Sequence, residues 1–142
     1  MTDRPLLHLV GYWRNAEHPE YPDPHELVDE AWDADERWAV ASYLFSGTFL
    51  RGMMGLSPCR ICGRPNGASE FTDGVLVWPE GLVHYVEDHA VRLPRAVEAH
   101  VLAAGDRLES ATVSTAWWVA GAPAPLPDRA GPTTAATTTD AP

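Results

Sequence analysis

The chain of 142 residues contains no Lys, only two Cys, and no apolar run long enough to cross a membrane. Its ten basic residues are therefore all Arg; they face twenty acidic residues, and the formal net charge is −10. Because a surface of that sign repels polyanions, we expect neither nucleic acid nor an anionic membrane as a partner. A membrane-spanning helix needs about 20 apolar residues, and no stretch of the chain supplies them.

The scarcity of cysteine excludes a disulfide-rich scaffold and an iron–sulfur cluster held by four thiolates. Cys59 and Cys62 lie three positions apart, a spacing typical of a metal or redox pair. Covalent haem attachment requires a His directly after the second Cys, and Gly63 stands there. The first residues include an early Asp and Pro and only a short apolar run, unlike a signal peptide. We therefore expect a cytoplasmic protein.

Local patterns predict an α+β fold, with a small antiparallel sheet and helices packed around it. Strands are expected at residues 6–13, 48–57, 69–72 and 75–78. The last two flank Asp73-Gly74, a strong signal for a two-residue hairpin turn. The Gly-Met-Met-Gly sequence at residues 52–55 lacks the Lys of a phosphate-binding loop and therefore does not predict one.

Helices are expected at residues 24–32 and 34–46, from Pro79 onward, and at residues 95–104. Asp23 and Asp33 are the expected N-caps of the first two. Trp38, Ala41 and Phe45 recur at helical spacing and form the expected apolar face of the second.

The end of the chain changes in composition. Gly105 is the expected stop of the helix at 95–104, and residues 111–119 are expected to form a last strand. Residues 120–142 are rich in Ala, Pro and Thr and offer too little apolar surface to fold. We therefore predict a single zinc-stabilised domain over residues 1–119, with its metal module at 58–94, and a disordered tail over residues 120–142.

The strongest chemical signal is the pattern Cys59-x2-Cys62-x21-His84-x4-His89. Two thiolates in a tight turn and two imidazoles on or near a helix are the donor set of a structural Zn²⁺ site. The order of parts, a cysteine knuckle followed by a β-hairpin and a helix, is similar to that of ββα and treble-clef zinc fingers. The gap of 21 residues is longer than in the common DNA-reading finger.

Helical phase leaves the fourth ligand open. On an ideal helix, five residues place His84 and His89 roughly 140° apart, which would turn His89 toward the core. Both bind one ion only where the helix widens or ends near Glu87. Asp88, four residues after His84, is the alternative fourth ligand, and His100 is a more remote one.

The phrases CRICGRPNGASEFTDG, VWPEGLVHYVEDH and VRLP resemble those of an uncharacterised group of small bacterial, actinomycete-like proteins. The resemblance extends roughly from residue 31 to residue 100. It implies that Cys59, Cys62, His84 and His89 act as a unit, and it implies no activity. The similarity to zinc knuckles in general covers residues 59–63 and implies a metal.

Nine acidic residues and no Arg lie between Glu17 and Glu36. They form either an acidic face for a basic protein partner or a solvated surface that also complements the helix dipoles. The leading hypothesis is a zinc-binding protein in which the metal is structural and the protein acts as a protein-interaction module. The alternatives are a zinc-dependent enzyme with an open metal position and a nucleic-acid-binding regulator.

Overall fold

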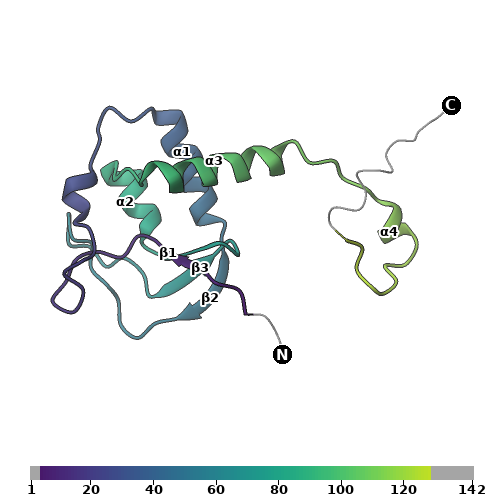
Figure 1. Cartoon of the computed structure of the whole chain (residues 1–142), viewed down its shortest axis with the longest axis horizontal. Coiled ribbons are helices and arrows are strands. Elements are labelled where there is room, and N and C mark those ends of the chain that lie inside the picture. Colours follow the sequence, from purple (N-terminus) through teal and green to yellow (C-terminus); the bar gives the residue numbers. More distant parts are fainter. Residues whose placement is uncertain (1–3, 129–142) are drawn as a thin grey trace. The chain divides into compact units, whose positions relative to one another are not determined.

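The computed structural model describes residues 4–128 of the chain. The chain divides into two compact units, of which the first ends at Glu109 and the second begins at Ser110. The predicted domain boundary, ten residues later, stays a prediction. The first unit contains every strand and the three longer helices, and Figure 1 shows its helices lying in a layer over the strands.

A four-stranded sheet in the order β1-β4-β3-β2 forms one layer of this unit. Its strands are β1 (His8–Leu9), β2 (Thr48–Gly52), β3 (Ser69–Thr72) and β4 (Leu76–Pro79). The α+β class is therefore confirmed, and a hairpin joins β3 to β4 through Asp73-Gly74. The turn is longer than the predicted two residues, because Thr72 pairs with Val77 and β4 begins at Leu76 instead of Val75. The sheet is mixed, however, because β1 pairs with β4 in parallel. A parallel pair needs a long connection, and here helices and the other strands lie between β1 and β4 in the sequence.

The predicted first strand is much too long. β1 ends at Leu9, and Gly11 follows with a φ of 84°, a left-handed conformation that ends the extended run. A side chain at Gly11 would also lie 2.8 Å from the Leu82 side chain. The chain therefore turns at Gly11 because it passes directly over the first turn of the helix that carries the histidines.

The helices of the first unit are η1 (Pro24–Leu27), α1 (Ala34–Phe45), α2 (Leu82–His89) and α3 (Arg95–Glu109). Asp23 and Asp33 are N-caps as predicted, since their carboxylates accept hydrogen bonds from the backbone N–H groups of His25 and Glu36. η1 is a single 3₁₀ turn, shorter than expected. The predicted stop at Gly105 is wrong: α3 continues to Glu109, because Gly lowers helix stability by only about 1 kcal/mol.

The core lies between the sheet and the helices, around the fully buried Trp78 of β4. The indole Nε1 of Trp78 donates a hydrogen bond of 3.1 Å to the carbonyl of Leu44. The inner face of α1 consists of Val40, Ala41 and Leu44.

The predicted apolar face of α1 is wrong at two of its three positions. Trp38 and Phe45 are 67% and 78% exposed, although Ala41 is buried. The reason is rotational: Val40 and Leu44 belong to the core cluster that contains Trp78, and Trp38 and Phe45 lie about 100° or more around the helix from them. The smaller apolar side chains of α1 are therefore buried in the core, and its two largest apolar side chains, Trp38 and Phe45, are exposed.

In the second unit, the described residues form a short helix, α4 (Ala116–Val119), where a strand was predicted. The indole Nε1 of Trp117 donates to the carbonyl of Pro123, a local bond that closes the following turn. The strand prediction is therefore wrong, since none of the strands formed by residues 4–128 pairs with this segment. Residues 129–142 of the predicted tail lie outside the described residues.

Among residues 4–128, no helix has the length and apolar character needed to cross a membrane.

Candidate metal centre

The two cysteines lie in a tight turn between β2 and β3. The N–H of Gly63 donates to the carbonyl of Cys59 at 2.8 Å, and a φ of 78° at Gly63 lets the chain reverse. The backbone N–H groups of Ile61 and Cys62 consequently lie 3.4 and 3.5 Å from the Cys59 sulfur. Both thiols are free; that of Cys59 is buried and that of Cys62 is exposed.

The two histidines lie on α2, which follows the hairpin. The Nε2 atom of His84 is 3.4 Å from the Sγ of Cys62. His89 is the last residue of α2, and its ring centroid lies 4.8 Å from that of His84, with the ring planes nearly perpendicular. The hairpin thus returns the chain so that the helix faces the cysteine turn.

The geometry of the last turn of α2 explains how His84 and His89 can lie side by side. The N–H groups of Ala90 and Val91 both donate to the carbonyl of Tyr85, five and six residues back, and Ala90 adopts a left-handed φ of 52°. Such bonds widen the last turn relative to the regular i to i−4 pattern. His89 therefore lies next to His84 despite a spacing that an ideal helix would turn away.

One candidate ligand atom from each of Cys59, Cys62, His84 and His89 lies within 4.8 Å of the other three. The Nε2 atom of His89 is buried and has no hydrogen-bond partner among the described residues. A buried polar atom left unsatisfied costs about 1–3 kcal/mol, and a bound metal ion would satisfy it. The structure thus brings together all four residues that the sequence singled out, in an arrangement with the chemistry to hold a metal ion.

Asp88, the alternative fourth ligand, lies behind His84 instead of beside it. Its carboxylate is 2.8 Å from Nδ1 of His84, the ring nitrogen that does not face Cys62. The guanidinium of Arg64 lies 3.8 Å from the same carboxylate. A carboxylate in that position fixes the tautomer and orientation of a ligating imidazole.

His100, the more remote alternative, is engaged elsewhere. Its Nε2 lies 2.8 Å from the Asp73 carboxylate at the hairpin turn, and His100 is not a member of the cluster. The same carboxylate accepts a hydrogen bond of 2.6 Å from the hydroxyl of Tyr43. The group therefore ties the hairpin to α1 and α3.

Local electrostatics favour the protonation states that a metal requires. Burial raises the pKa of the Cys59 thiol, but hydrogen bonds from the N–H groups of Cys62 and Ile61 outweigh it, so the pKa lies below its usual value. Burial lowers the pKa of His89, and the neighbouring His84 lowers it further, which favours the neutral ring.

Tyr85 is the residue that sequence reasoning missed. Its ring packs in the core, edge-on against Trp13, with 5.3 Å between the centroids. Its hydroxyl also accepts a hydrogen bond of 2.7 Å from the backbone N–H of Arg60, inside the cysteine turn. Burial raises the pKa of Tyr85, and so does the nearby Cys59. No local signal identifies such a contact, because its partners lie 25 residues apart in the sequence.

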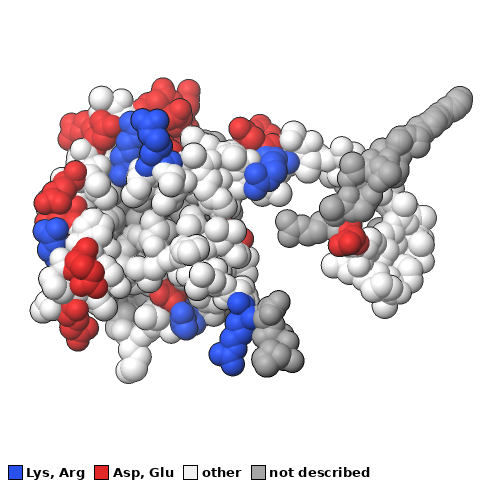
Figure 2. Space-filling model, in the orientation of Figure 1, with Lys and Arg blue, Asp and Glu red and all other residues white. Residues whose placement is uncertain are grey.

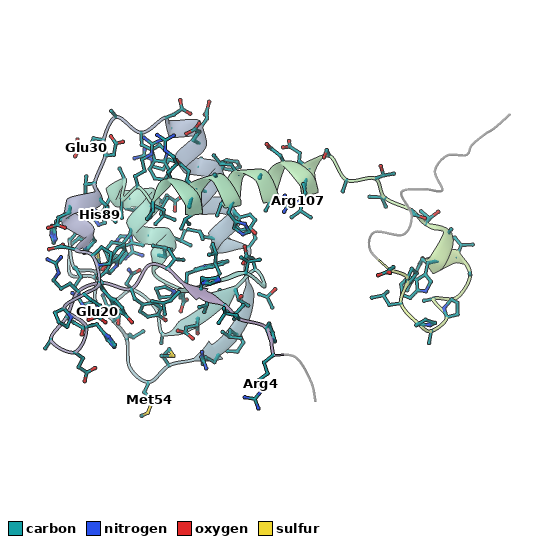
Figure 3. All side chains as sticks on the ribbon, in the orientation of Figure 1. Arg4, Glu20, Glu30, Met54, His89 and Arg107 are labelled. Carbon is teal, nitrogen blue, oxygen red and sulfur yellow. The ribbon has the colours of Figure 1, made fainter. Side chains whose placement is uncertain are left out.

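An open groove of about 410 Å³ lies against one side of the cluster. Figure 3 labels His89 at the end of α2 and Glu30 in the segment before α1, and both residues line the groove. Arg37 and Asp88 also line it, so three of its seven lining residues are charged.

Comparison of the chain with family models, curated proteins and solved structures found no match. The assignment of a metal site therefore depends on the geometry and chemistry of the four residues themselves.

Proposed function

We propose that Cys59, Cys62, His84 and His89 bind one Zn²⁺ ion that stabilises the fold, and that the protein is a protein-interaction module. Two thiolates and two imidazoles form the donor set of many structural zinc sites. The two backbone N–H groups directed at the Cys59 sulfur support this assignment, because hydrogen bonds to a ligand are a regular part of such sites.

The observation that carries the proposal is the convergence of four donors, one of them the buried, unpartnered imidazole of His89. Zinc–sulfur and zinc–nitrogen bonds of about 2.3 and 2.0–2.1 Å place tetrahedral ligand atoms roughly 3.3–3.8 Å apart. The largest separation here is 4.8 Å. Closing the site therefore requires small side-chain movements and no rearrangement of the backbone.

A structural role follows from the ligand count. Four protein ligands complete a tetrahedron and leave no position for a reactive water molecule. The ion would join the turn before β3 to the end of α2, two segments that are more than 20 residues apart in the sequence. Because the unfolded chain holds no preformed site, the free energy of metal binding becomes free energy of folding.

The charge of the surface supports a protein as the partner. The acidic residues between Glu17 and Glu36 surround η1 and the start of α1, and Figure 2 shows red side chains gathered over that part of the first unit. Such a surface attracts basic partners and accelerates their association, and it repels nucleic acid.

The test is to measure metal content and X-ray absorption on the wild type, Cys59→Ala and His89→Ala. We expect about one zinc per chain in the wild type, with two sulfur and two nitrogen ligands and no oxygen ligand. Cys59→Ala should lose stoichiometric zinc. Stoichiometric metal and an unchanged fold in Cys59→Ala would overturn the zinc assignment, and so would a metal-free wild type purified without chelators.

A second candidate, a zinc-dependent hydrolase, is favoured by the groove that His89 and Glu30 line. If His89 left the metal, Cys59, Cys62 and His84 would hold it with one position open to water, and a carboxylate in the groove would serve as the base. X-ray absorption separates the two candidates, since this one requires three protein ligands and one oxygen.

A further inference from the structure

The outer side of α1 carries two large apolar side chains that pack against nothing in the core. Trp38 and Phe45 are 67% and 78% exposed, and their spacing of seven residues, about two turns, places them on the same side of the helix. The first unit contains four Trp residues, and the other three, Trp13, Trp32 and Trp78, are at most 8% exposed. Trp38 is thus set apart from every other Trp of that unit.

A shallow groove of about 360 Å³ between α1 and α2 is lined by Phe45, and Trp38 lies one turn of α1 before the lining residues Ala41 and Ser42. Its lining residues are Ala41, Ser42, Phe45, Ser46, Val83 and Glu87. We call Trp38 together with these six residues the α1–α2 surface. It combines an aromatic edge, small residues that allow close approach, and one carboxylate at the rim.

The charges around the α1–α2 surface identify the kind of occupant. Asp35 is exposed one turn before Trp38, and Glu87 is exposed on α2. The only cationic side chain on these two helices, apart from their histidines, is Arg37, which lines the separate groove beside His89. A second copy of this chain would bring the same carboxylates, and a net charge of −10, against the surface. A partner with basic residues beside its apolar ones matches it instead.

We propose that the α1–α2 surface docks a basic amphipathic helix of a partner protein, with Trp38 and Phe45 as the apolar anchors. The proposal rests on the proposed function as an interaction module and names the surface and the chemistry of the partner. An amphipathic helix places its apolar side chains into such a groove at positions i, i+3, i+4 and i+7. Tryptophan is over-represented among the residues whose truncation weakens protein interfaces most.

The test uses the full, metal-loaded chain and two synthetic 18-residue peptides with the same Leu positions. One carries Lys at its remaining positions, and the other carries Glu. Binding is measured by calorimetry, and the contact surface is mapped by NMR chemical shifts. We expect the Lys peptide to bind, with shifts concentrated on α1 and α2, and the Glu peptide to show no binding.

The variants are designed to leave the core and the metal cluster intact. Trp38→Ser with Phe45→Ser should weaken binding of the Lys peptide at least 10-fold, and Glu87→Lys should weaken it several-fold and reduce its dependence on salt. Phe49→Ser, which removes a 60% exposed Phe from β2, is the matched control and should bind like the wild type. Zinc content and melting temperature are measured on every variant, so a failure of the metal site is recognised independently.

Three outcomes would overturn the proposal. The first is equal binding of the Lys peptide by the wild type and by the Trp38→Ser, Phe45→Ser variant. The second is that the chemical-shift changes map to residues outside α1 and α2. The protein could then still be an interaction module, but it would bind through another surface. The third is a concentration-dependent dimer of the wild type that the double substitution abolishes, because the occupant would then be a second copy.

Discussion

The Asp88 carboxylate holds the ring nitrogen of His84 that faces away from Cys62. A carboxylate of this kind strengthens a ligating imidazole and fixes its tautomer, and its loss typically lowers metal affinity by about 10–100-fold. It would thus support a metal held by His84 without touching that metal.

We therefore expect Asp88→Asn to bind zinc with unchanged stoichiometry and with affinity reduced by about 10–100-fold. Competition with a chromophoric chelator measures the affinity. Glu87→Gln, which changes the exposed neighbouring carboxylate, is the control and should match the wild type. Equal affinity in all three proteins would show that Asp88 has no part in orienting His84.

Asp73 provides a second prediction for a single residue. Burial raises the pKa of this carboxyl, but hydrogen bonds from the N–H of Leu76 and from Tyr43, His100 and Val75 outweigh it and bring the pKa to about 2. Because the pKa is lower in the folded state than the usual 3.8, the stabilisation is fully present above pH 3.8 and is lost as the pH falls toward 2.

We expect Asp73→Asn to lower the free energy of unfolding by about 1.5–3 kcal/mol at pH 7, the usual range for hydrogen bonds to a charged group. The difference from the wild type should shrink between pH 4 and pH 2, as the wild type loses its carboxylate. Urea unfolding across this range measures it, and loss of metal at low pH affects both proteins alike. Asp35→Asn, at an exposed position on α1, should unfold like the wild type; a constant difference at every pH would contradict the prediction.

At the scale of elements, α3 continues past a residue that is a common helix stop signal. Val101 and Ala104, which precede Gly105, are buried in the core, and the exposed residues 106–109 continue the helix to Glu109. Gly105 lacks the positive φ of a helix terminator, and a Cβ built at this position meets no atom within 4 Å.

Gly105→Ala should therefore raise the free energy of unfolding by about 0.5–1 kcal/mol, because Ala loses less backbone entropy in a helix. Denaturant unfolding is the measurement. Gly74→Ala serves as the opposite case, since Gly74 has a φ of 92° and Ala should cost about 1–2 kcal/mol in that conformation. Destabilisation by Gly105→Ala would contradict the prediction, because it would indicate that Gly105 ends α3 instead of lying inside it.

At the scale of the whole molecule, the core and the candidate metal site share residues of the first unit. Cys59 is buried as part of the hydrophobic core, and Tyr85 contacts both the core residue Trp13 and the cysteine turn. We therefore expect the loss of a bound metal to affect the core through these two residues.

We expect a chelator, under reducing conditions, to lower the melting temperature of the wild type by about 15 °C or more. A loss of only about 3 kcal/mol is enough for a shift of this size in a domain of about 100 residues. Calorimetry with and without chelator measures it, and near-ultraviolet circular dichroism follows the packing of the aromatic side chains. Cys59→Ala should melt at the same low temperature in both conditions. An unaffected wild type would show that any bound metal contributes nothing to stability.

The sequence alone determined the α+β class, the place of the hairpin around Asp73-Gly74, though not the length of its turn, and the N-caps Asp23 and Asp33. These features depend on local chemistry: which residues accept positive φ, and which side chains bond to the N–H groups at a helix start. The four residues of the cluster were also identified from spacing, because the x2 turn and the paired histidines are local motifs.

Only the tertiary structure decided which side of each element faces inward and which distant groups meet. The place of His89 depended on a widened last turn, which the packing of Tyr85 and Val91 sets and helical periodicity does not show. The exposure of Trp38 depended on which face of α1 meets Trp78, and the parallel pairing of β1 depended on contacts made across most of the first unit. Each of these outcomes depends on contacts between residues that are far apart in the sequence. Local sequence patterns do not show which of these contacts form.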